Sequence, residues 1–247
     1  MKTNSEDKLT ISQGYAILGA GAVGALAYAF SDSFWFSAVE GEVYAMSSLF
    51  TAIVFWAILK WEESANQRTG YRWLLLIAYM IGLSIGVHLL NLLAIPAIVY
   101  VYYYKRYPYS LKGFIIAGIT SLVILVVIMY LIIPGIVQLA GNFELFFVNT
   151  LGLPFNSGTV VYFLAIAGLI AWGLIYTRKK SKVVLNTVIL AFLFILIGYS
   201  SFFMLIIRAN ANTPINENDP KDAISLLSYL NREQYGDRPL MFGQTFN

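Results

Sequence analysis

Long apolar stretches, rather than short alternating ones, dominate the hydrophobic pattern of this chain. A helix needs about 20 consecutive apolar residues to cross the hydrocarbon core of a bilayer. Five stretches come close to that length: 12–30, 45–60, 113–133, 159–177 and 183–207. The residues before the first stretch are mostly polar, so this stretch is typical of a first membrane helix rather than of a cleaved signal peptide.

A further apolar stretch, residues 73–104, is too long for one span. As a single helix its roughly 32 residues would measure about 48 Å, whereas the hydrocarbon core is about 30 Å thick. His88 and Asn91 interrupt it near the middle. We therefore predict two short spans, 73–87 and 89–104, which turn at His88 and end in a locally thinned or protein-lined region.

The basic residues lie on one side of this division. That side carries Lys2, Lys8, Lys60, Arg68, Arg72, Lys105, Arg106, Lys112, Arg178, Lys179, Lys180 and Lys182. The opposite loops, 31–44, the His88 turn and 134–158, carry no Lys or Arg. Because cytoplasmic loops are enriched in these residues, we expect a cytoplasmic N-terminus and an external tail from Arg208. A six-span division would place two basic clusters outside, so the charge pattern favours seven spans.

The composition agrees with a membrane protein. Hydrophobic residues make up 59% and charged residues 12% of the chain, whereas soluble domains are about half apolar and a quarter charged. We predict an all-α integral membrane protein, with about seven transmembrane helices in a polytopic domain over residues 1–207, surrounded by membrane lipids. The chain has no cysteine and one histidine, which excludes disulfides, thiolate sites and multi-histidine metal centres. No metal site is expected.

Tyrosines gather between residues 100 and 109, beside Lys105 and Arg106. Aromatic residues of this kind form belts at membrane surfaces. We therefore expect an interfacial belt on the cytoplasmic side. No nucleic-acid partner is expected, because the segment ends a membrane span.

The tail, residues 208–247, is soluble in character and is predicted to lie outside the membrane as the start of a further domain. Asp219 and Pro220 are suitable as an N-cap and a first helical residue. Ala223, Leu226, Leu227 and Leu230 follow at helical spacing. A short helix packed on the membrane face or on a further domain is predicted.

Residues 19–24 match the glycine pattern of dinucleotide-binding proteins. That pattern works only after a strand and at the start of a helix, whereas these glycines lie inside an apolar span. Small residues at this spacing let membrane helices approach closely. Helix packing is therefore favoured over nucleotide binding.

The predicted external loop 31–44 carries Asp32, Glu40 and Glu42 among bulky aromatic residues, without any cation. A carboxylate in an apolar setting can serve as an acid or a base. The same aromatic residues would also suit a simple membrane anchor, and the sequence leaves both readings open.

Glu42 is the carboxylate favoured first. If a helix runs through the loop, Trp35, Val39, Glu42 and Met46 share one face. Glu42 would then belong to a buried stripe, and Glu40 would point elsewhere. A buried acid without a cation is costly unless it is protonated, hydrogen-bonded or used.

His88 and Asn91 lie at the turn of the predicted hairpin, on the same side of the membrane as the carboxylates. A lone histidine there more often shapes a turn than catalyses. The loop 134–158 is bounded by prolines, is rich in phenylalanine and carries one acid, Glu144. A loop resting on lipid is slightly favoured over a groove beside a lipid-linked substrate.

Two segments, residues 30–46 and 82–91, resemble the signatures of the bacterial domain-of-unknown-function 2723 family. Residues 217–220 and 229–236 resemble the start of the region that follows the membrane helices in that family. The family is similar to protein O-mannosyltransferases of the GT-C superfamily. The resemblance therefore implies a GT-C-like fold in the bacterial inner membrane, with a periplasmic tail.

The resemblance also implies the reaction. The donor is expected to be a polyprenyl-phosphate sugar, with mannose as the first candidate, and no cofactor is expected. The acceptor is expected to be a Ser or Thr hydroxyl of an exported protein. A lipid phosphate leaves readily, but a hydroxyl needs a base. Catalytic candidates are Glu42, Glu40 and Asp32; substrate-binding candidates are Trp35, Tyr44, His88 and Asn91.

The chain departs from the family in two respects. Members begin with additional membrane helices, whose first external loop carries an acidic motif, and they continue past this C-terminus. We therefore expect a piece of a larger enzyme, or a split form. The main alternative is a non-catalytic scaffold or subunit that binds a lipid-linked sugar or a partner protein. A transporter is third, because the broken hairpin at His88 has no repeat elsewhere.

Overall fold

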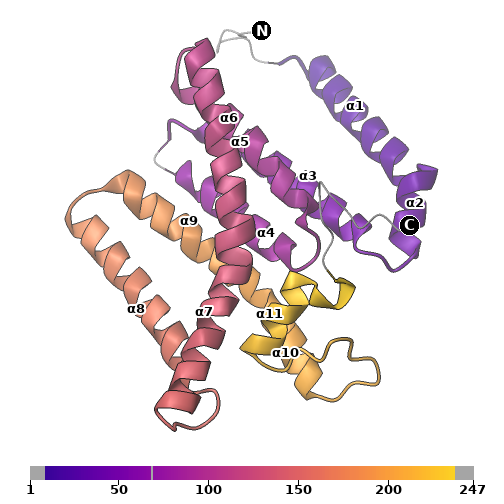
Figure 1. Ribbon diagram of the computed structural model, residues 1–247. Helices are drawn as coiled ribbons and strands as arrows, with labels where there is room; N and C mark the ends of the chain where they lie inside the picture. The colour runs from indigo at the N-terminus through magenta and orange to yellow at the C-terminus, as the bar shows by residue number, and fades with distance from the viewer. Residues whose placement is uncertain (1–8, 68, 237–247) are drawn as a thin grey trace, which may run out of the picture. The chain divides into compact units, whose positions relative to one another are not determined.

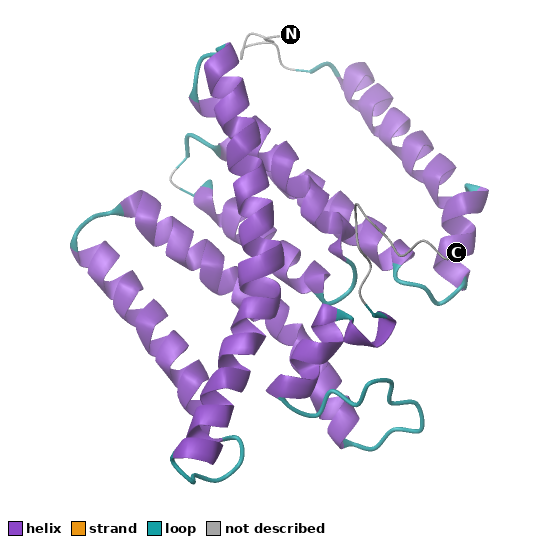
Figure 2. Cartoon of the chain, in the orientation of Figure 1, coloured by secondary structure: helices purple, strands orange, loops and turns teal. Residues whose placement is uncertain are grey.

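A computed structural model describes residues 9–67 and 69–236. Every regular element in these ranges is a helix (Figures 1 and 2), as the sequence predicts. The α-helices are α1 (Ile11–Ala29), α2 (Asp32–Val39), α3 (Tyr44–Ser64), α4 (Tyr71–Ile85), α5 (Ala94–Arg106), α6 (Leu111–Val126), α7 (Ile133–Leu145), α8 (Ser157–Lys179), α9 (Val183–Tyr199), α10 (Phe203–Asn210) and α11 (Ala223–Asn231). Shorter helical turns are η1 (Leu89–Leu93), η2 (Val127–Ile132), η3 (Phe146–Thr150), η4 (Ser200–Phe202) and η5 (Glu233–Tyr235).

The chain forms two compact units, Met1–Leu49 and Phe50–Asn247. In the first unit, α1 is one uninterrupted helix, so the glycine-rich segment at 19–24 lies within a helix and follows no strand. This agrees with the preference against nucleotide binding. No atom lies within 4 Å of where a Cβ would stand at Gly19, Gly21 or Gly24. The predicted packing of other helices against these glycines stays a prediction.

The predicted break at His88 is confirmed. Helix α4 ends at Ile85, and a short turn leads through His88 into η1 and then α5. Helices α4 and α5 both contact η1, which joins them, and α5 packs in turn on α6.

Helices α4 and α9 cross at very short range in the second unit. A Cβ atom at Gly82 would lie under 3.0 Å from backbone atoms of Ile195, and one at Gly198 would lie under 3.0 Å from the backbone of Leu83. Only glycine leaves room for two backbones at this separation. The crossing therefore depends on both glycines.

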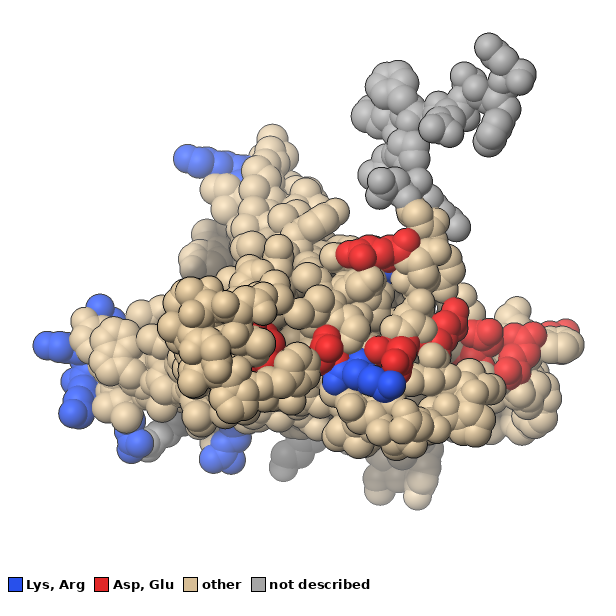
Figure 3. Space-filling model, turned by 60° about the horizontal axis from the view of Figure 1, so that its bottom comes forward, with Lys and Arg blue, Asp and Glu red and all other residues tan. Residues whose placement is uncertain are grey.

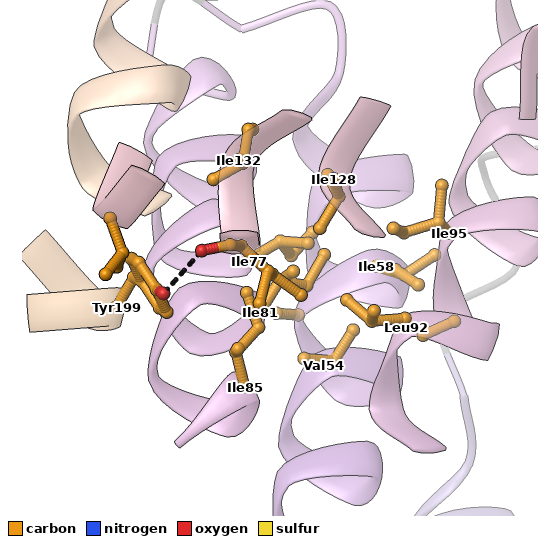
Figure 4. Close-up of a cluster of buried hydrophobic side chains, with 14 of the residues drawn as sticks. Val54, Ile58, Ile77, Ile81, Ile85, Leu92, Ile95, Ile128, Ile132 and Tyr199 are labelled. Carbon is orange, nitrogen blue, oxygen red and sulfur yellow. Dashed lines mark hydrogen bonds between the residues drawn. The ribbon is translucent and has the colours of Figure 1, made fainter. Parts of the chain in front are cut away.

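A hydrophobic core forms beside this crossing (Figure 4). It includes Val54, Ala57, Ile58, Ile77, Ile81, Ile85, Leu92, Ile95, Ile128, Ile132, Ile133, Val137, Tyr199 and Leu226. The Tyr199 hydroxyl donates a hydrogen bond of 2.7 Å to the Ile133 carbonyl. This bond fixes α9 to the start of α7 and satisfies a buried hydroxyl.

The prediction of a loop over residues 134–158 is wrong for residues 134–150, which are helical. Helical structure runs without interruption from Leu111 to Thr150, over 40 residues. Proline usually ends a helix because it lacks an N–H and its ring meets the preceding turn. Here the wider π-helical turn η2 comes directly before Pro134. Such a turn rearranges the local hydrogen bonds, so that the helix can continue past the proline.

The count of seven spans is not confirmed. Among the described residues, four helical segments are long and apolar enough to cross a membrane, and the bent pair α1 and α2 gives a fifth candidate. Helix α4 has 15 residues, or roughly 22 Å, which is short for a bilayer. Whether or not α4 and α5 cross the membrane as a pair, the chain enters and leaves this pair on the same side of the membrane. The charge pattern therefore favours an odd number of crossings but does not separate five from seven.

Parts of the charge argument lie outside the described residues, namely Lys2, Lys8 and Arg68, as does the terminal segment 237–247.

The tail helix begins three residues later than predicted. Asp219 has a φ of 41°, in the left-handed region, whereas an N-cap residue adopts the extended region. Asp222 is the N-cap instead, and its carboxylate accepts hydrogen bonds from the backbone N–H of Ile224 at 2.9 Å and Ser225 at 2.8 Å. Helix α11 packs on α7, and Leu226 is 1% exposed. The proposed domain boundary at residue 208 stays a prediction.

We expect Gly198→Ala to destabilise the protein by about 2 kcal/mol, because the added methyl group would meet backbone that cannot move freely. Thermal unfolding of the purified chain in detergent measures this. The matched control is Gly168→Ala on α8, where no atom lies within 4 Å of the new Cβ. Equal melting temperatures for the two variants would contradict the close crossing of α4 and α9.

Candidate functional site

The three predicted catalytic carboxylates lie on α2 and on the link that follows it. Asp32 is the first residue of α2, and Glu40 is its C-cap. Gly41, with a φ of 71°, then turns the chain, and Glu42 precedes α3 by two residues. We call residues 40–43 the acidic link.

The side chains of Asp32, Glu40 and Glu42 are exposed. Among the described residues, none of these three carboxylates forms a hydrogen bond or an ion pair. The acids of the acidic link therefore remain available to a ligand. Unpaired acids also suit an ordinary surface, so this geometry alone does not separate the two readings left open by the sequence.

Glu42 does not lie in a buried stripe, and that part of the sequence argument is wrong. It assumed one helix from Trp35 to Met46, but α2 ends at Val39 and α3 starts at Tyr44. The left-handed backbone at Gly41 breaks the helical spacing. Trp35, Glu42 and Met46 are all exposed on the chain itself.

Aromatic rings surround the start of α2. The Phe30 and Trp35 rings stack with centroids 6.2 Å apart, and those of Tyr28 and Phe34 lie 4.6 Å apart. The Ser31 hydroxyl donates to the Tyr28 carbonyl at 2.8 Å and accepts from the Phe34 N–H at 3.4 Å. Ser31 thereby holds the bend between α1 and α2, which measures 59°. Trp35 is 55% exposed and lies on the same short helix as Asp32, one turn further on.

The substrate-binding candidate Tyr44 begins α3 and is half exposed. It follows the acidic link directly. The first unit therefore brings Asp32, Trp35, Glu40, Glu42 and Tyr44 into one short stretch of chain.

His88 and Asn91 belong to the second unit, which is described separately. The His88 Nδ1 atom accepts a hydrogen bond of 3.1 Å from the Leu90 N–H and so caps η1. Asn91 is fully buried, and its Nδ2 donates to the Ser84 hydroxyl at 3.0 Å. The buried Oδ1 of Asn91 accepts no hydrogen bond from the described residues. Both side chains thus fasten η1 to the hairpin, and their role in substrate binding stays a prediction.

Glu144 has a role that the sequence reading missed. It is 3% exposed, and its carboxylate accepts hydrogen bonds from the Asn156 N–H at 2.5 Å, the Thr159 N–H at 2.9 Å and the Thr159 hydroxyl at 3.0 Å. A carboxylate at a helix N-terminus satisfies free N–H groups and the helix dipole. Glu144 therefore caps α8 from α7.

Gly158 completes this contact. A Cβ atom there would lie under 3.0 Å from the backbone of Phe143 and Glu144. A single buried acid in a membrane segment is usually a functional candidate. In Glu144 the full set of hydrogen bonds points to a structural role, joining α7 to α8.

No three His, Asp or Glu side chains come together as metal ligands anywhere in residues 9–67 and 69–236.

Comparison with protein families matches the first part of the chain. The family model described as "Protein O-mannosyl-transferase TMEM260 N-terminal domain" matches residues 1–111. This range contains residues 30–46 and 82–91, the two signature segments of the family resemblance, but not residues 217–220 and 229–236. The match supports a relation to protein O-mannosyltransferases and is consistent with a glycosyltransferase. No curated protein and no solved structure matches the chain.

We expect Glu144→Gln to destabilise the protein by about 1 to 2 kcal/mol, because the amide loses the charge and turns a donor toward N–H groups. Thermal unfolding in detergent measures the change. Glu217→Gln removes an equal charge from an exposed loop position and should leave the melting temperature unchanged. A Glu144→Gln variant as stable as this control would show that the cap contributes little.

Proposed function

We propose that this chain is part of a membrane glycosyltransferase that moves a sugar, with mannose as the first candidate, from a polyprenyl-phosphate donor to Ser or Thr hydroxyls of exported proteins. The observation that carries the proposal is the family match over residues 1–111, which includes the acidic link. Available carboxylates beside an aromatic surface, two residues before a candidate membrane span, support it.

The reaction needs one base. A carboxylate takes the proton from the acceptor hydroxyl. At the same time the oxygen of that hydroxyl forms a bond to the anomeric carbon of the sugar. The bond from that carbon to the phosphate oxygen breaks, and the lipid phosphate leaves with the electron pair. Because the phosphate is already a stable anion, it needs little help from an acid.

Glu42 remains the first candidate for this base, now for its place along the chain. A lipid-linked sugar is held at the membrane boundary by its lipid, and Glu42 lies just before α3, which is long and apolar enough to span. Glu40 is the neighbouring carboxylate and Asp32 the third candidate. Trp35 and Tyr44 are proposed to contact the sugar, since aromatic rings cover the apolar face of a pyranose.

The proposed setting is a bacterial inner membrane, with the acidic link and the tail on the periplasmic side. The positive-inside rule supports this orientation. In Figure 3 basic side chains gather at the left edge of the view, where the α8–α9 turn lies; Arg178, Lys179, Lys180 and Lys182 are exposed there. The α2–α3 link, by contrast, carries no basic residue.

A non-catalytic scaffold is the second candidate. The exposure of the carboxylates favours this alternative. Among the described residues, Asp32, Glu40 and Glu42 lie on the surface and are not enclosed in a cavity. A scaffold would bind the lipid-linked sugar without transferring it. Measuring binding and transfer on the same preparation separates the two functions.

We expect Glu42→Gln in the complete protein to reduce mannose transfer more than about a hundredfold, the scale of a lost general base. Transfer from polyprenyl-phosphate mannose to a serine-containing peptide provides the measurement. Glu40→Gln should have a smaller effect.

The matched control is Glu62→Gln, an exposed acid at the other end of α3, which should transfer at the wild-type rate. Wild-type transfer by Glu42→Gln would show that Glu42 is not the base. Sugar binding without any transfer by the wild-type protein would favour the scaffold.

A further inference from the structure

A groove lies between α5 and α6 in the second unit, at the end where the two helices are joined. It has a volume of about 490 Å³, and its lining includes Tyr102, Tyr103, Tyr107, Gly113, Ile116 and Thr120. Most of this lining is hydrocarbon or aromatic carbon. Helix α6 begins the segment Leu111–Thr150, which is long and apolar enough to cross a membrane, so one wall of the groove belongs to a candidate span.

Tyr103 keeps the groove in shape. Its hydroxyl accepts a hydrogen bond of 2.8 Å from the Ser110 N–H and lies 3.1 Å from the Ser110 carbonyl, to which it can donate. Gly113 leaves room for the ring, because a Cβ atom there would lie under 3.0 Å from it. The turn between the helices is therefore fixed before any ligand binds.

Two lysines without partners among the described residues lie close in the chain to residues that line this end of the groove. Lys105 is in the last turn of α5 and Lys112 in the first turn of α6; both are exposed, and neither forms an ion pair or hydrogen bond among the described residues. Arg106 differs, since it donates to the Ala65 carbonyl at 2.6 Å and to the Asn66 side chain at 3.3 Å.

Acids are sparse in the part of the chain that forms the groove. The chain contains no Asp or Glu between Glu63 and Glu144. On the neighbouring end of α3, where Trp61 stacks on Tyr102 at 5.4 Å, Glu63 is paired with Lys60 at 2.9 Å and Glu62 is exposed. An apolar groove between helices that carry free cations in their adjoining turns complements an anion that carries a hydrocarbon chain.

We propose that this groove binds an anionic phospholipid of the surrounding membrane. One acyl chain lies along the groove against Ile116 and Thr120, and the phosphate lies between Lys105 and Lys112. Basic clusters beside membrane helices attract anionic lipids with about 1 kcal/mol per residue. An acidic peptide would use the lysines but leave the apolar groove uncovered, so the lipid is favoured.

The test uses the complete chain in uncharged detergent, with phosphatidylglycerol and phosphatidylcholine of identical acyl chains, and native mass spectrometry to count bound lipid. We expect the double substitution Lys105→Gln and Lys112→Gln to weaken phosphatidylglycerol binding about thirtyfold. Phosphatidylcholine binding should not change.

Two further variants make the outcome decisive. Lys179→Gln with Lys180→Gln removes the same charge at the α8–α9 turn and should leave phosphatidylglycerol binding unchanged. Thr120→Trp fills the groove but keeps both lysines, and it should weaken binding. Equal losses in the two lysine pairs, or full binding by Thr120→Trp, would overturn the proposal. Displacement of the lipid by a soluble acidic peptide would point to a protein partner instead.

Discussion

The close crossing of α4 and α9 is the constraint on which the second unit depends. Gly82 and Gly198 allow two backbones to meet where any side chain would clash. Tyr199 then reaches the carbonyl of Ile133 and fixes α9 to the start of α7. Just beyond, Gly86 leaves room for the Ser201 hydroxyl near the hairpin turn. The hairpin and the hydrophobic core are therefore built around this contact, which gains its strength from packing rather than from the hydrophobic effect alone.

Two kinds of acid in the chain have opposite surroundings, and this difference directs the functional proposal. Glu144 is buried, but its carboxylate is satisfied by the N-terminus of α8. Its burial is explained without a substrate. Glu40 and Glu42 have no partner among the described residues and follow an exposed tryptophan, Trp35, closely in the chain. The proposal of sugar transfer therefore rests on Glu40 and Glu42, whose carboxylates are free to bind a ligand, and not on the buried Glu144. The family match over the same part of the chain supports it.

The sequence predicted the helices well and their ends less well. Apolar length located α1, α3, α8 and α9, and the polar break at His88 located the hairpin, because these signals are local. The failures arose where local signals compete: the π-helical turn η2 carries the helix past Pro134, and left-handed backbone at Gly41 and Asp219 ends or shifts a helix that residue spacing alone would continue. The cap from Glu144 to α8 could not be predicted, since it joins residues brought together only by the fold.

The most direct test of the arrangement is which side of the membrane each loop faces. The chain has no cysteine, so single cysteines can be placed at four exposed positions and treated in sealed cells with an impermeant thiol reagent. Cysteines at Ser33 and Thr150 should react from outside, whereas those at Gln67 and Ser181 should react only after the membrane is opened. Labelling of Ser181→Cys from outside, or protection of Ser33→Cys, would contradict an external acidic link, and with it the proposed transfer to exported proteins.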